Sequence, residues 1–131
     1  MRTLIAGLAL ALVACGGDSA TGANTTPGTY LMRTLNGQAL PYVIAQTGAN
    51  KSELTDDAVT LNAGGTYTET GHVRNTTNGQ VTTQSHVDAG SFTLNGTAIT
   101  LLSTDGTSVS GTLNGSTLTV VEQGLSAVYT K

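Results

Sequence analysis

Two histidines offer the first candidate chemistry in this sequence. His72 and His86 flank an Asn78-Gly79 pair, which is typical of a tight hairpin, so the imidazoles could face each other across neighbouring strands. Glu69 or Asp88 would then supply a third ligand for a metal ion.

Side-chain alternation argues against that metal site. Successive side chains of a strand point to opposite faces, so if Val73, Val81 and Val87 point into the core, both histidines point to solvent. Two exposed ligands without a rigid third bind a metal weakly. We therefore predict surface histidines, no metal site and no cofactor.

Residues for catalysis are also missing. Gly48-Ala49-Asn50-Lys51-Ser52 resembles the end of a phosphate-binding loop but has Asn50 where that loop needs glycine. Asp56 and Asp57 are adjacent, so on a strand they point to opposite faces and cannot work as a pair. The sequence contains no Gly-x-Ser-x-Gly motif around a nucleophile. We predict no catalytic residue and no enzymatic activity.

Glu69 is the carboxylate that needs an explanation, because it shares the predicted inner face of Tyr67. An inward carboxylate would need a hydrogen-bond partner such as Tyr30 or Tyr129, or a ligand. A bulge near Gly71 that turns Glu69 outward is the other interpretation.

Cys15 carries the most specific signal in the sequence. It is the only cysteine, and it follows Arg2 and an apolar run from Leu4 to Val13 that is too short to span a bilayer of roughly 30 Å. The ending Leu12-Val13-Ala14-Cys15 is similar to a bacterial lipobox, in which the cysteine thiol receives a diacylglyceryl group.

Three segments follow from that signal: a signal peptide over residues 1–14, a lipidated flexible linker over 15–27, and a folded domain over 28–131. The linker is rich in Gly, Ser, Thr and Asn and has no apolar periodicity. Acyl chains on Cys15 would attach the protein to a membrane. The predicted location is the bacterial cell envelope. Gly16 after the cysteine resembles the pattern of lipoproteins that are sorted to the outer membrane in enterobacteria, which implies that membrane.

Composition limits which folds and which partners remain possible. The chain has 131 residues and a net charge of −3, with 10% charged and 4% aromatic residues, which excludes long salt-bridged helices and coiled coils. Five Lys and Arg residues, spread singly, form no basic stripe. Nucleic acid is therefore excluded as a partner.

Short apolar alternations between regular turn signals predict an all-β domain. The turn signals are Asn36-Gly37, Gly64-Gly65, Asn78-Gly79, Asn95-Gly96, Asp105-Gly106, Asn114-Gly115 and Gln123-Gly124. We expect an antiparallel up-and-down meander of about 8–10 strands closed into a barrel, because closure removes exposed edges. A flattened sandwich is the alternative.

Four aromatic residues mark a candidate ligand pocket. Tyr30, Tyr67, Phe92 and Tyr129 open or close strands at glycine-marked ends, where interior side chains from several strands can converge. The other interpretation is that these four side chains plug a small core.

Several segments together resemble one family: Gly28-Thr29-Tyr30, residues 36–41 (NGQALP), residues 59–67 (VTLNAGGTY), residues 90–96 (GSFTLNG) and residues 128–131 (VYTK). They are similar to the lipocalin-like domains of small bacterial lipoproteins. The resemblance covers residues 28–131 and implies a lipocalin-like barrel. It identifies no ligand-binding residue.

Two functions remain open. The barrel could bind a small apolar or amphipathic molecule, which the scarcity of large core side chains favours. Alternatively, it could be filled and serve as a structural lipoprotein that contacts another envelope protein. A cavity inside the barrel would favour the first function.

Overall fold

The computed structural model describes residues 26–131, which are entirely β-strands and turns. The ten strands are β1 (Gly28–Leu35), β2 (Gln38–Ala39), β3 (Tyr42–Thr47), β4 (Asn50–Leu61), β5 (Thr66–Thr77), β6 (Gln80–Asn95), β7 (Ala98–Ser103), β8 (Ser108–Asn114), β9 (Thr117–Glu122) and β10 (Leu125–Thr130). The predicted signal peptide and Cys15 lie outside the described residues. Within the described part, no helix has the length and apolar character needed to cross a membrane.

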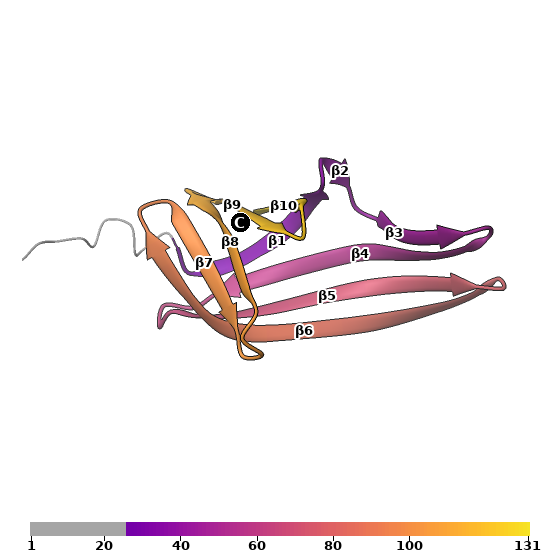
Figure 1. Ribbon diagram of the computed structural model, residues 1–131, viewed down its shortest axis with the longest axis horizontal. Coiled ribbons are helices and arrows are strands. Elements are labelled where there is room, and N and C mark those ends of the chain that lie inside the picture. Colours follow the sequence, from indigo (N-terminus) through magenta and orange to yellow (C-terminus); the bar gives the residue numbers. More distant parts are fainter. Residues whose placement is uncertain (1–25) are drawn as a thin grey trace, which may run out of the picture.

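Eight of the strands, β1 and β4 to β10, form a closed antiparallel barrel (Figure 1). Consecutive strands from β4 to β10 pair as neighbours, and β1 closes the barrel by pairing with β10 on one side and β4 on the other. The expected closed meander is therefore confirmed, and the sandwich is not formed. β2 and β3 are additional short strands that pair with β1 and β4.

The turns lie where the sequence predicts them, because asparagine and glycine tolerate positive φ angles. Asn36 and Asn78 have φ angles of 51° and 52°, and each is followed by a glycine with φ of 78°. One further turn lies at Gly48, between β3 and β4, where the glycine has a φ of 61°.

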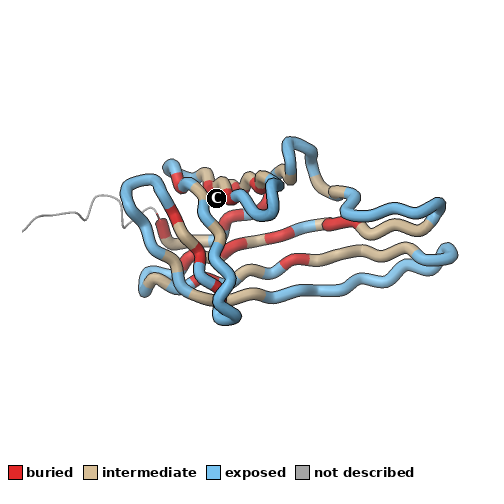
Figure 2. Tube along the Cα trace, in the orientation of Figure 1, coloured by how far each residue is buried: buried red, intermediate tan, exposed pale blue. Residues whose placement is uncertain are grey.

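Most of the buried segments of the trace in Figure 2 belong to the barrel. The largest fully buried side chains lie toward one end of the barrel, which we call the filled end. These are Tyr30, Val59, Leu61, Ile99 and Leu118. They come from five different positions on β1, β4, β7 and β9, so burying them requires the barrel to be closed. Tyr30 also donates a hydrogen bond from its hydroxyl to the carbonyl of Thr26, at 2.7 Å.

The three longest strands project beyond the other end of the barrel (Figure 1). We call this projection the ribbon: β3 together with residues 50–55 of β4, 72–77 of β5 and 80–87 of β6. β6 pairs with β7 only from Gly90 onward, so residues 80–88 have β5 on one side and no strand on the other within the described part of the chain.

The predicted inward position of Val81 and Val87 is wrong. They are 60% and 70% exposed, although alternation suggested that they belong to the core. The reason is that β6 is one continuous strand of 16 residues, paired to β5 without a bulge. Phe92 packs against the core, so even-numbered residues of β6 face inward and odd-numbered ones face outward.

Candidate functional site

A cavity of about 480 Å³ lies at the end of the barrel from which the ribbon projects. Its rim includes Asp105 and Thr107 from the β7–β8 turn and Gln123 from the β9–β10 turn. One part of its wall is apolar. The side chains there are Met32, Leu54, Val59, Leu101, Val109 and Val120.

The rest of the cavity wall is acidic. Asp57 on β4, Glu69 on β5, Asp88 on β6 and Glu122 on β9 all contribute to it. His86 on β6 is the only basic residue among those that line the cavity. The wall therefore carries more negative than positive charge at neutral pH.

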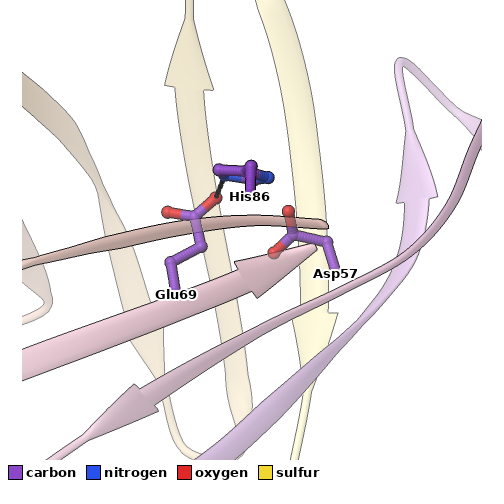
Figure 3. A group of neighbouring side chains, drawn as sticks. All are labelled: Asp57, Glu69 and His86. Atoms are coloured by element: carbon purple, nitrogen blue, oxygen red, sulfur yellow. Dashed lines mark ion pairs between the residues drawn. The ribbon is translucent and has the colours of Figure 1, made fainter. Parts of the chain in front are cut away.

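Three of these side chains converge on one patch of the wall (Figure 3). Asp57, Gly71 and His86 form one cross-strand row, and Glu69 lies one inward-facing position along β5 from Gly71. His86 Nε2 lies 3.7 Å from Glu69 Oε1. One potential ligand atom from each of Asp57, Glu69 and His86 lies within 4.8 Å of the other two.

Gly71 permits that convergence. A Cβ atom at this position would lie 2.7 Å from Asp57 Oδ2 and 2.9 Å from His86 Nδ1, which is too close for either. Glycine in the interior of a strand weakens it and marks a site where other atoms approach closely. Here those atoms are a carboxylate oxygen and an imidazole nitrogen.

Asp57 is buried, with 5% of its surface exposed. Burial raises the pKa of Asp57 to about 8, and the negative charge of nearby Glu69 acts in the same direction. Burial also raises the pKa of Glu69. The hydroxyl of Tyr129 lies 3.4 Å from Asp57 Oδ1 and donates toward it. Asp57 and Glu69 therefore form a coupled pair that retains a proton at neutral pH.

Asp88 has a different environment on the same wall. Its carboxylate accepts hydrogen bonds from the Tyr67 hydroxyl at 2.7 Å and the Ser103 hydroxyl at 2.5 Å. Burial pushes the pKa of Asp88 upward, but the hydrogen bonds from Ser103 and Tyr67 outweigh it and keep the pKa below its usual value. Asp88 is thus an ionised, internally satisfied carboxylate.

The four aromatic residues of the predicted pocket separate into two pairs. Tyr67 and Tyr129 line the cavity, and both hydroxyls reach carboxylates. Tyr30 and Phe92 do not line it: Tyr30 is fully buried at the filled end, and Phe92 packs beside the core. Cys15, the predicted lipidation site, lies outside the described residues.

The two histidines lie on opposite faces of the sheet, and both side chains are exposed as expected, at 41% for His72 and 50% for His86. His72 is on the outer surface, where its Nδ1 lies 2.6 Å from Asp56 Oδ1. His86 lines the cavity with Asp57. The adjacent aspartates do point to opposite faces, as predicted.

The sequence prediction rejected a metal site at His86 and Glu69, and did not include Asp57 in it, because it assigned the wrong face to one half of β6. The distinguishing signal was present: Val87 and Phe92 have opposite parity, so they cannot both point inward on one unbroken strand. Placing Phe92 inward would have placed His86 and Asp88 inward as well.

Comparison with known protein families, with curated proteins and with solved structures finds no match for this chain.

Proposed function

We propose that the protein is a lipid-anchored lipoprotein of the bacterial cell envelope, of the outer membrane in particular, whose lipocalin-like barrel binds a small amphipathic molecule rather than catalysing a reaction. The cavity of about 480 Å³ carries this proposal. Its volume lies within the usual range for small-molecule sites, roughly 300–1,000 Å³. A barrel that served only as a structural body would be expected to have a close-packed interior.

Because one part of the cavity wall is apolar and the rest is acidic, the cavity favours an amphipathic guest over a purely apolar one. Apolar side chains such as Leu101 and Val109 can cover a hydrocarbon or aromatic portion, while Tyr129 and the acidic residues offer hydrogen-bond partners to a polar end. An entirely apolar guest would leave buried carboxylates without water, which is unfavourable.

Uptake of the neutral dye N-phenyl-1-naphthylamine tests the binding function. Leu101→Trp, which adds volume inside the cavity, should abolish the fluorescence increase shown by the parent protein. Leu102→Trp is the matched control, because Leu102 is the next residue of β7 and is 46% exposed on the outside. Dye uptake that is lost equally in both variants, or absent from the parent, would contradict the proposal.

Lipidation rests on the Leu12-Val13-Ala14-Cys15 ending. Metabolic labelling with a clickable palmitate analogue should mark the parent protein but not Cys15→Ser. Equal labelling of both proteins would exclude lipidation at this cysteine. Fractionation of labelled cells would then assign the protein to the outer or the inner membrane.

The ribbon favours a second candidate function, contact with another envelope protein. Residues 80–88 of β6 offer an unpaired strand edge, the kind of edge to which another chain can add a strand. A photo-crosslinking residue at Thr83 should form a discrete adduct in cells, whereas one at Ser116, in a turn at the filled end, should not. Adducts at neither position would remove this candidate.

A further inference from the structure

Asp57, Glu69 and His86 have the composition of a metal site as well as its proximity (Figure 3). Carboxylate oxygen and imidazole nitrogen are both ligands of Zn²⁺, which holds them at about 2.0–2.2 Å and, in tetrahedral geometry, places neighbouring ligand atoms roughly 3.3 Å apart. The separation of 3.7 Å between His86 Nε2 and Glu69 Oε1 is close to that value. Small side-chain rotations would bring the Asp57 oxygen into the same sphere.

The backbone supports this convergence independently of the side chains. The three residues come from three adjacent strands. β5 pairs with β6 without a register shift, and it pairs with β4 in one register from Asp56 to Leu61, beyond a bulge between Leu54 and Asp56. Gly71 lies between Asp57 and His86 and has no side chain to separate them. A rigid sheet with a glycine at that position holds the donors together without needing a flexible loop.

The carboxyl groups at this patch have no lysine or arginine beside them in the described part of the chain. Within the described residues, no lysine or arginine lines the cavity, although Asp57, Glu69, Asp88 and Glu122 all do. Glu53 on the ribbon shows the usual alternative: its buried carboxylate is bonded to Lys51 at 2.9 Å and to Arg74 at 2.8 Å. A cation between Asp57 and Glu69 would supply what the protein's own side chains do not.

We propose that Asp57, Glu69 and His86 bind a divalent transition-metal ion of the Zn²⁺ class, with at least one coordination position open to the cavity. The imidazole ligand favours such an ion over Mg²⁺ or Ca²⁺, which prefer oxygen ligands only. This site does not depend on the guest of the cavity, and the metal is tested alone.

Isothermal titration with ZnCl₂ tests the site in the untagged full chain carrying Cys15→Ser, which removes the thiol as a competing ligand. One Zn²⁺ should bind per chain, and Zn²⁺ should raise the midpoint of thermal unfolding. Asp57→Asn and His86→Ala should each weaken Zn²⁺ binding at least tenfold and remove the thermal shift. Co²⁺ in place of Zn²⁺ should give visible absorption that both variants lose.

The outer pair His72 and Asp56 provides a matched control. It combines the same residue types at 2.6 Å but lies exposed on the opposite face. His72→Ala and Asp56→Asn should therefore leave Zn²⁺ affinity unchanged. A loss of binding in these variants, or binding that persists in Asp57→Asn, would overturn the assignment.

Further measurements distinguish a loss of Zn²⁺ binding from a folding defect and from a loss of ligand binding in the cavity. Gly71→Ala adds one methyl group between Asp57 and His86, and in a variant that still unfolds cooperatively it should weaken Zn²⁺ binding. Displacement of Zn²⁺ by an equal concentration of Ca²⁺ would refute a transition-metal site. Dye uptake by metal-free protein reports on the cavity alone, so either property can fail without the other.

Discussion

The closed barrel and the ribbon are made from the same strands, yet they differ in how their side chains are covered. In the barrel, each strand has a neighbour on both sides and an opposite wall, so Val59 and Leu61 on β4 are 1% exposed. In the ribbon, β6 has one neighbour and Val81 is 60% exposed. Burial therefore depends on the opposing wall and not on alternation alone.

The largest expected effect comes from breaking the closure. Deleting residues 125–131 removes β10, which separates β1 from β9 and leaves both with an exposed edge. It also removes Tyr129 from the interior. We expect loss of cooperative thermal unfolding, measured by circular dichroism and calorimetry.

Shortening the ribbon is the matched change outside the barrel. Deleting Thr76, Thr77, Gln80 and Val81 removes two opposite residue pairs and keeps the Asn78-Gly79 turn and the side-chain alternation. The shortened protein should unfold cooperatively near the parent midpoint. Similar losses from both deletions would mean that ribbon and barrel form one equally interdependent unit.

An intermediate effect should come from removing the same side chain in each region. Ile99 is 1% exposed in the barrel and Ile44 is 53% exposed on β3 of the ribbon. Ile99→Ala should destabilise the protein by about 2–5 kcal/mol through lost burial and a new cavity. Ile44→Ala should cost on the order of 1 kcal/mol or less, because half of its surface already contacts water.

Urea unfolding of the two isoleucine variants measures this difference directly. Equal destabilisation would show that the ribbon folds back on a surface and buries Ile44 in solution. A larger loss for Ile44→Ala would reverse the comparison between the regions.

Local chemistry explains which parts of this fold can be predicted from the sequence. Asn78-Gly79 and the similar pairs set turns through their own φ angles, and the resulting meander of short strands has to close to avoid open edges. The site is not local in this sense. The pairing of β6 with β7 from Gly90 onward decides whether His86 points inward. The apolar alternation around Val81 and Val87 predicts the opposite face for His86.

The length of β6 is the other feature that could not be predicted. Its 16 residues include polar and exposed positions on both faces, so no apolar period marks where the barrel ends and the ribbon begins. The cavity lies at that transition, because the strands continue there without an opposite wall. Asp57 was consequently considered only as half of an adjacent pair, and Glu69 was left between an inward position and one turned outward by a bulge.

The smallest expected effect comes from two buried carboxylates on β4 whose pKa values are shifted in opposite directions. Hydrogen bonds from Lys51 and Arg74 lower the pKa of Glu53 below 4.5, whereas burial raises the pKa of Asp57 from 3.8 to about 8. Glu53 therefore stabilises the fold above its unfolded pKa, and that contribution is lost as pH falls through its lower folded pKa.

Asp57 behaves in the opposite way. The folded protein holds the Asp57 proton more tightly than the unfolded chain, so its contribution is fully present below pH 3.8 and is lost as pH rises toward about 8. Above that value both states are ionised and the dependence ends. Glu69, His86 and Tyr129 all lie beside Asp57, and the charge of Glu69 affects the pKa of Asp57, so the comparison has to be made between the parent and single variants.

Urea unfolding of metal-free protein across this pH range separates the two carboxylates. Asp57→Asn should be more stable than the parent near pH 8 and gain little near pH 4, since asparagine carries no charge to bury. Glu53→Gln should be less stable than the parent near neutral pH and converge with it in acid, where Glu53 is protonated. If Asp57→Asn instead lost stability at high pH, its carboxylate would have a cationic partner in the fold, and the uncompensated wall of the cavity would not exist.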